Sequence, residues 1–164
     1  MKSVLVVALL LGLSSLSGAV RQQAYAVKGK LLCGTAPAGN VRIKLWEEDS
    51  GPDPDDLLDQ GYTKPDGTFE LKGDTIEATD IDPVFKVYHD CDDGIKPGSR
   101  KPGSRKVKFS LPKSYISSGK VAKKTFDIGV LNLETIFPNE ERELYISKKR
   151  RHIFEDWALV AYYF

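Results

Sequence analysis

The stretch Val41-Arg42-Ile43-Lys44-Leu45 alternates apolar and cationic side chains with a period of two residues. Successive side chains of a β-strand point to opposite faces of a sheet, so this alternation predicts a strand with Arg42 and Lys44 outward. The same period recurs along the chain, where the inward residues are Tyr25, Val27, Leu31 and Cys33, then Phe85 and Val87, then Val107, Phe109 and Leu111, then Phe126, Ile128 and Val130. About seven short strands separated by turn residues predict an all-β fold, an antiparallel two-sheet sandwich.

Turn residues predict how these strands pair. The sequence PAGN at residues 37–40 predicts that the strand at 41–45 forms a hairpin with the strand that ends at Cys33. The sequence KPDG at residues 64–67 predicts a second hairpin, between 61–63 and 68–71, because proline presets φ and glycine accepts the left-handed conformation. The inward Gly29 leaves room in the first strand for a bulge or a close neighbour.

Three segments depart from the strand pattern. Residues 47–59 are acidic and contain prolines, which predicts an exposed loop. Residues 114–120 could hold a helical turn. Residues 139–149 could form a helix, because their glutamates come early and their cations late, which suits the helix dipole.

The N-terminal residues have the pattern of a secretory signal peptide. Lys2 precedes an apolar run over residues 4–13, and small residues follow at Ser17, Gly18 and Ala19. We expect cleavage after Ala19 and a secreted, extracellular protein with no transmembrane segment; a membrane anchor is the alternative, but the run is shorter than the roughly 20 residues that span a bilayer. The expected domains are a signal peptide over 1–19, the sandwich over 20–137 and a C-terminal tail over 138–164 that holds a short helix or is disordered.

The chain contains two cysteines, Cys33 and Cys91, and two histidines, His89 and His152. In an oxidising compartment we expect the cysteines to form a disulfide, which would stabilise the fold by about 4 kcal/mol in the chain-entropy model. Two free buried thiols or a metal pair are the alternatives. A four-ligand zinc site would need carboxylates in addition to the histidines, and the spacing does not fit the common zinc motifs, so we expect no metal and no cofactor.

A series of motifs follows along the expected mature chain: Val27-x-Gly29-x-Leu31-x-Cys33, Val41-x-Ile43-x-Leu45, Gly67-x-Phe69-x-Leu71-x-Gly73, residues 83–91 ending in Tyr88-His89-Asp90-Cys91, residues 111–116, and residues 126–133. In this order they resemble the transthyretin-like family of secreted nematode proteins. The resemblance implies a prealbumin-like β-sandwich, an extracellular location and a binding role, with no agreed ligand for the family. The chain lacks the second cysteine pair of some members, and residues 152–164 match nothing in the family.

The chemistry of related folds is not carried by this sequence. The wider transthyretin fold includes hydrolases of a purine-catabolism intermediate, which use several histidines, an arginine and a C-terminal Tyr-Arg-Gly-Ser type of ending. The sequence has neither the histidines nor the ending, so we expect no catalytic residues and no enzyme activity, and thyroid-hormone carriage does not transfer either. His89 is expected to be a packed, hydrogen-bonded strand residue.

Charge is segregated along the chain although the net charge is only +1. Between Gly94 and Phe126 there are ten lysines and arginines and no acidic residue, and the sequence KPGSR at 96–100 is repeated at 101–105. We predict that this stretch binds an anionic ligand outside the cell, through side chains that face away from the core. The predicted residues are Lys96, Arg100, Lys101, Arg105, Lys106 and Lys108. The alternative is a solvated surface balanced by the acidic residues 47–59.

The leading hypothesis for function is a secreted, non-enzymatic binding or bridging module. Its partners would be an anionic phospholipid surface, such as phosphatidylserine on apoptotic cells, or an acidic receptor ectodomain, and not nucleic acid. The alternative is an extracellular carrier of a small apolar ligand; a structural protein without a discrete ligand is a third option. The basic residues 148–151 and the aromatic residues after them fit an interfacial anchor, a processing site or a disordered end.

Overall fold

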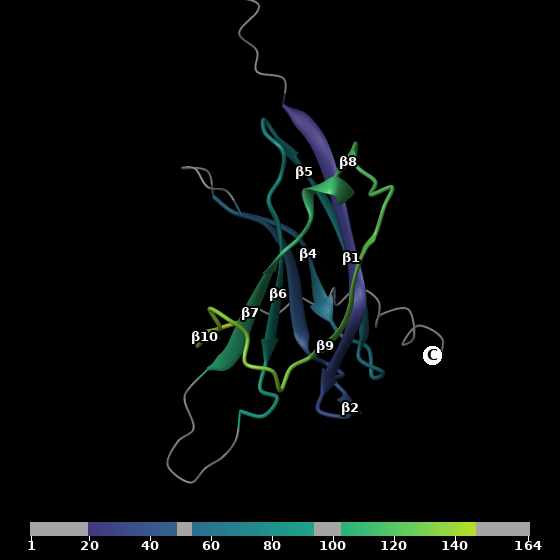
Figure 1. The fold of residues 1–164 in the computed structure, drawn as a ribbon. Coiled ribbons are helices and arrows are strands. Elements are labelled where there is room, and N and C mark those ends of the chain that lie inside the picture. Colours follow the sequence, from purple (N-terminus) through teal and green to yellow (C-terminus); the bar gives the residue numbers. More distant parts are fainter. Residues whose placement is uncertain (1–19, 49–53, 94–102, 147–164) are drawn as a thin grey trace, which may run out of the picture.

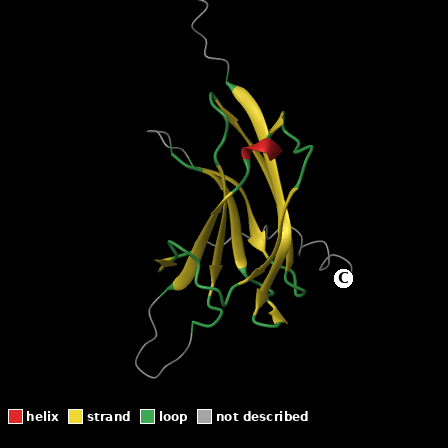
Figure 2. Ribbon diagram, viewed as in Figure 1, coloured by secondary structure: helices red, strands yellow, loops and turns green. Residues whose placement is uncertain are grey.

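The computed structural model describes residues 20–48, 54–93 and 103–146, and these residues form two packed sheets of five strands each (Figures 1 and 2). The first sheet contains β1 (Arg21–Cys33), β2 (Ala36–Pro37), β5 (Thr68–Glu77), β8 (Ser117–Ser118) and β9 (Phe126–Asn132). The second sheet has the order β10-β7-β6-β3-β4, with the bounds Glu141–Glu143, Ser104–Ser110, Pro83–His89, Arg42–Glu47 and Asp56–Tyr62. The predicted all-β sandwich is confirmed.

The core lies between the two sheets and contains the residues that the alternation placed inward. Six of the predicted core residues are almost completely buried: Val27, Leu31, Ile43, Leu45, Phe85 and Val87. Phe109 and Ile128 are partly buried and pack against this cluster. The rings of Phe69 and Phe85 stack at 4.7 Å between centroids, and those of Phe85 and Phe109 at 6.3 Å, so aromatic rings fill the space between the sheets.

The predicted hairpin between β1 and the strand at 41–45 is wrong. β1 turns back only into the two-residue β2, and the chain then crosses to the second sheet, where β3 pairs with β4 and β6. Both sides of β1 already have partners, β5 on one and β9 with β8 on the other. Ala38 marks the crossing, since its N–H donates to the carbonyl of Leu31 and its carbonyl accepts from the hydroxyl of Thr63.

The turn at residues 64–67 forms as expected, but the strands on its two sides belong to different sheets. The N–H of Gly67 donates to the carbonyl of Lys64 at 2.8 Å, and Gly67 has φ +80°. β4 nevertheless pairs with β3, and β5 pairs with β1. β4 and β5 approach each other closely at Gly73, where a Cβ would lie 2.1 Å from the carbonyl oxygen of Leu58. The chain therefore passes from the second sheet to the first along this edge.

The exposed loop expected over 47–59 is wrong for most of its described residues. Glu47 is buried at the end of β3, and Asp56 to Asp59 belong to β4; residues 49–53 lie outside the described residues. The acidic side chains accept hydrogen bonds from neighbouring segments: Asp59 accepts from the N–H of Lys72 at 3.0 Å, and Asp56 from the hydroxyl of Thr75 at 2.6 Å. These long-range partners offset the local preference for a loop.

The last long strand, β9, pairs with β1 in parallel and contains a bulge. Gly129 has φ +79°, and the register shifts opposite Gly29, where a Cβ would lie only 2.6 Å from Cγ2 of Ile128. The predicted close neighbour at Gly29 is therefore confirmed. Because the bulge adds one residue, Val130 is exposed and Leu131 packs against the core instead, which corrects its predicted inward orientation.

Two further predictions concern short segments. Within 114–120 the chain forms a 3-10 turn, η1 (Lys113–Tyr115), followed by β8. The helix expected over 139–149 is wrong for its described part, which contains β10 paired with β7. Cross-strand cations on β7 bind the glutamates of this segment, and they offset the helical preference.

The predicted disulfide between Cys33 and Cys91 is confirmed. It joins the end of β1 in the first sheet to the turn that follows β6 in the second, with the two Cα atoms 5.7 Å apart. The described residues contain no free cysteine. The bond therefore links the two sheets at one end of the sandwich.

Candidate functional site

A row of three lysines crosses the outer face of the second sheet. Lys44 on β3 is directly opposite Lys86 on β6, and Lys86 is directly opposite Lys108 on β7. Neighbouring strands lie about 4.8 Å apart, so the side chains of such a row are close neighbours. Like charges directly opposite one another destabilise a sheet. The fold therefore bears an electrostatic cost along this row.

The three lysines point away from the core, as the alternation predicted, but Lys108 is exposed whereas Lys44 and Lys86 are not. Lys44 is 6% exposed and Lys86 is 7% exposed, and the neighbouring Arg42 is also buried. Aromatic rings cover them: the ammonium of Lys86 lies 4.7 Å from the ring of Trp46, and that of Lys44 lies 5.3 Å from the ring of Tyr88. Arg42 and Lys44 therefore lie on the outward face as predicted, yet they are buried, because aromatic side chains on the same face pack over them.

Carboxylates surround the row from other elements. Glu48 lies 2.6 Å from the ammonium of Lys86 and 3.2 Å from that of Lys108. On the next row, Lys106 binds Glu141 at 3.1 Å and Glu143 at 3.2 Å. These ion pairs explain how the lysines are tolerated on this face.

Burial and charge perturb the titration of these groups. Burial lowers the pKa of Lys44, and the charge of Arg42 lowers it further. For Glu48, burial acts to raise the pKa, but the hydrogen bonds and charges of Lys86 and Lys108 outweigh it, so the pKa of this carboxyl is lowered. Each charged form therefore depends on an opposite charge nearby, and an anion bound beside Lys44 would stabilise its ammonium.

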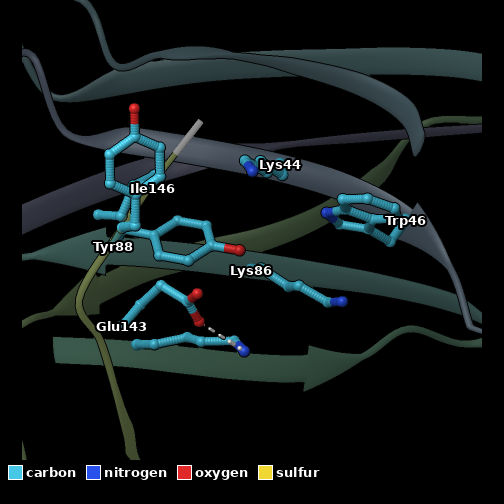
Figure 3. A pocket seen from close by; sticks show the side chains of 8 residues that line it. Lys44, Trp46, Lys86, Tyr88, Glu143 and Ile146 are labelled. Atoms are coloured by element: carbon cyan, nitrogen blue, oxygen red, sulfur yellow. Dashed lines mark hydrogen bonds and ion pairs between the residues drawn. The ribbon is translucent and has the colours of Figure 1, made fainter. Parts of the chain in front are cut away.

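The row borders a groove of about 340 Å³, which lies within the range of small-ligand sites (Figure 3). Lys44 and Lys86 lie on neighbouring strands in its floor, with Tyr88 and Trp46 on either side (Figure 3). Lys106 and three residues at the C-terminal end of the described chain, Glu143, Tyr145 and Ile146, complete the lining. The indole N–H of Trp46 is buried without a hydrogen-bond partner among the described residues. The groove can hold an anionic group beside a flat or apolar one.

The predicted site residues have different outcomes. Lys96, Arg100 and Lys101 lie outside the described residues. Lys106 and Lys108 lie at the groove and at the end of the lysine row, respectively, and their role in binding stays a prediction.

Arg105 does not face away from the core, which corrects its predicted orientation. Its guanidinium is buried and donates to the carbonyls of Cys91 at 2.8 Å, Leu133 at 3.0 Å and Thr135 at 3.0 Å. It also donates to the carboxylate of Glu140 at 2.8 Å. The turns that carry these carbonyls meet at the start of β7, and one arginine satisfies them all. Arg105 is therefore a structural residue.

The residues of the groove floor were not predicted as a site, although a signal for them exists. The sequence places a cation and an aromatic two residues apart in Lys44-x-Trp46 and again in Lys86-x-Tyr88. Both pairs lie on the outward face of their strands, so a groove with cationic and aromatic walls follows once these strands are known to be neighbours. This spacing does not stand out as a charge run, because each motif contains a single cation.

His89 is packed at the C-terminal end of β6, as expected, but the expected hydrogen bonds of its ring are absent among the described residues. It is 4% exposed, and neither ring nitrogen has a hydrogen-bond partner among the described residues. Burial, assisted by the charge of Arg105, lowers its pKa to about 4, so the ring is neutral at physiological pH. In the described part of the chain no group of three His, Cys, Asp or Glu side chains could hold a metal ion.

Comparison with known proteins decides the family. The model of the transthyretin-like family matches residues 28–112, which include β3, β6 and β7 of the groove. The chain belongs to this family. Transthyretin-like protein 46 of Caenorhabditis elegans is 68% identical over 143 residues, which cover 87% of this chain and 78% of that protein. Transthyretin-like protein 33 of the same organism is 46% identical over 127 residues, 77% of this chain and 85% of that one.

A third transthyretin-like relative and one solved structure complete the comparison. Transthyretin-like protein 5 of Caenorhabditis elegans is 42% identical over 139 residues, 85% of this chain and 96% of that one. A 9R-lipoxygenase from Cyanothece aligns with 71% of this chain and 18% of its own at 24% identity, with a TM-score of 0.38, which is too low to support an argument. Among the described residues of this transthyretin-like chain, no helix is long and apolar enough to cross a membrane.

Proposed function

We propose that this transthyretin-like protein is a secreted, non-enzymatic binding module whose groove on the second sheet binds the head groups of anionic phospholipids. The observation that carries the proposal is the row Lys44, Lys86 and Lys108, in which like charges face one another across three strands. A bound phosphate or carboxylate would offset this repulsion. The expected signal peptide, outside the described residues, supports an extracellular location.

Exposed side chains beside the groove favour a membrane surface as the source of the anion. Tyr62 on β4 lies beside Arg42, and Tyr145 follows β10; both are exposed. Tyrosines next to cations are typical of surfaces that contact the interfacial region of a membrane, because their rings are apolar and their hydroxyls are polar. Each lysine or arginine near an anionic membrane contributes about 1 kcal/mol to binding.

The earlier site prediction is retained in part. Lys96, Arg100 and Lys101 precede β7 in the sequence and are proposed as additional contacts, together with Lys106 and Lys108. Arg105 is removed from the binding set because it holds three backbone carbonyls. A second, protein partner that would make the molecule a bridge remains part of the proposal. The carrier of an apolar ligand finds no support in the space between the sheets, since stacked rings fill the described core.

Vesicle binding tests the proposal. Wild-type protein is expected to bind phosphatidylserine–phosphatidylcholine vesicles and not vesicles of phosphatidylcholine alone, and high salt should release it. Lys44→Met/Lys86→Met should weaken binding by roughly thirtyfold, because two lysines at about 1 kcal/mol each are lost. The matched control is Lys28→Met/Lys72→Met, which removes two lysines from the first sheet. Thermal melting confirms that each variant folds.

Two results would reject the proposed function. One is equal binding of the wild type to both kinds of vesicle. The other is binding by Lys44→Met/Lys86→Met that matches the control variant, since the groove would then contribute no more than any other pair of lysines.

A further inference from the structure

We infer that residues 143–146, called the strap below, act as an internal competitor for the groove: the carboxylate of Glu143 holds Lys106 until the anion of the ligand displaces it. This inference rests on the proposed function of the groove and adds its regulation. The strap begins at Glu143, the last residue of β10, and supplies Glu143, Tyr145 and Ile146 to the groove lining. The strap therefore forms part of the groove wall that a bound ligand would contact.

The strap is attached mainly by charge. Glu143 lies 3.2 Å from the ammonium of Lys106, and the dashed line that starts at Glu143 in Figure 3 marks this ion pair. β10 contributes only three residues to the ladder with β7. Beyond it, Leu144 is 74% exposed and Tyr145 is 87% exposed, so little apolar burial holds these residues against the sheet. An attachment of this kind is weak and can be exchanged for another anion.

The segment before the strap is fixed firmly, which confines any movement to the strap itself. Glu140 pairs with the buried Arg105. Arg142 donates to the carbonyl of Gly103 at 2.8 Å and pairs with Asp93. The ring of Phe137 packs edge-on against Phe109 at 5.2 Å. These contacts keep Glu141 and Arg142 on the edge of β7, so that movement is confined to Glu143, which ends the ladder opposite Ser104, and to the residues after it.

Competition follows from the charges at the groove. Lys106 has two carboxylates, Glu141 and Glu143, and only Glu143 lines the groove. The negative charge of Glu143 also acts on Lys44, across the groove floor. An incoming phosphate would face repulsion from Glu143 while seeking the same ammonium groups. Binding is strongest when Glu143 has moved away, because Lys106 then retains Glu141 and loses the carboxylate that competes with the ligand in the groove.

A pair of charge-matched variants tests this inference. Glu143→Gln removes the competing charge, and Glu134→Gln is the control, because it also raises the net charge by one and its exposed side chain lies in another turn. With phosphatidylserine–phosphatidylcholine vesicles, Glu143→Gln should bind up to about fivefold more tightly than the wild type, and Glu134→Gln should bind like the wild type. Hydrogen exchange of wild-type peptides covering 143–146 should become faster when vesicles bind, and that of β6 should not change.

The outcomes separate the strap from the function of the groove. Equal affinities of Glu143→Gln and Glu134→Gln, or slower exchange of 143–146 on binding, would overturn the strap while leaving the groove in place. If Lys44→Met/Lys86→Met also binds like its control, the groove fails and the strap fails with it.

Discussion

On the outer faces of the two sheets, the cross-strand neighbours of a central lysine carry the opposite charge in one sheet and the same charge in the other. On the first sheet, Lys28 is directly opposite Glu70 on β5 and Asp127 on β9, so carboxylates flank it on both sides. On the second sheet, Lys86 is flanked by Lys44 and Lys108. The first arrangement stabilises a sheet and the second opposes it. The same fold holds both rows, and on the second face Glu48, which pairs with Lys86 and Lys108, offsets part of the repulsion.

The cations of the second sheet are expected to differ in their contribution to stability. Arg105 should have the largest effect on the free energy of unfolding. Arg105→Met should lower the free energy of unfolding by about 3–5 kcal/mol, because it leaves Glu140 and three backbone carbonyls without their buried partner. Lys108→Met, at the solvent-exposed end of the row, should change it by less than about 1 kcal/mol. Urea denaturation measures both values. A similar small loss for the two variants would mean that Arg105 belongs with the binding cations.

His89, the buried last residue of β6, tests whether a second residue of this sheet lowers the free energy of unfolding. Its pKa falls from 6.5 to about 4 on folding, mainly by burial. Between these pH values the unfolded chain binds a proton that the folded protein does not bind, so the free energy of unfolding decreases as the pH falls through this window. The loss from this residue should reach about 3 kcal/mol at pH 4.

His89→Leu isolates the contribution of this histidine from that of the carboxylates. Urea denaturation at pH 7 and pH 4 should give a smaller loss of stability on acidification for His89→Leu than for the wild type. Identical losses in the two proteins would show that the acid sensitivity comes from the ion pairs and not from His89.

The smallest expected effects on the free energy of unfolding come from replacing one lysine in each of the two rows. Lys44→Met removes a buried ammonium that faces Lys86, so it should leave the free energy of unfolding unchanged or raise it by up to about 1 kcal/mol. Lys28→Met removes a lysine flanked by carboxylates and should lower it by up to about 0.5 kcal/mol. Thermal and urea denaturation in low salt measure these values. A clear loss of stability in Lys44→Met would remove the contrast between the two faces.

Prediction from sequence was reliable for strands and unreliable for their partners. The inward positions of Ile43, Leu45 and Phe85 followed from alternation, the turn at 64–67 from its proline and glycine, and the disulfide from the two cysteines in an expected oxidising compartment. The hairpins were wrong, because a turn fixes only the direction of the chain over a few residues. Whether the next strand returns to the same sheet depends on which edges are already occupied, as at β1, and on close approaches such as that at Gly73.

The candidate site shows the same division. The acid-free stretch over 94–126 pointed to Lys106 and Lys108, but the carboxylates that bind them, Glu48, Glu141 and Glu143, lie far away in the sequence. A run of like charges is a property of the chain, whereas the local field is a sum over neighbours in space. The groove residues Lys44 and Trp46 lie outside the charge run altogether.

The sequence by itself determined the fold class, the faces of most strand residues, the cysteine pair and the family resemblance, because each depends on side-chain period or on a local motif, whereas the orientations of Val130 and Arg105 did not follow from it. Only the tertiary structure decided that β3, β6 and β7 are adjacent and in the register that aligns Lys44, Lys86 and Lys108. Only the structure decided, in the same way, that Arg105 is buried while these lysines border a groove. The physical reason is that register and burial arise from contacts between residues distant in the chain, which a period of two cannot encode.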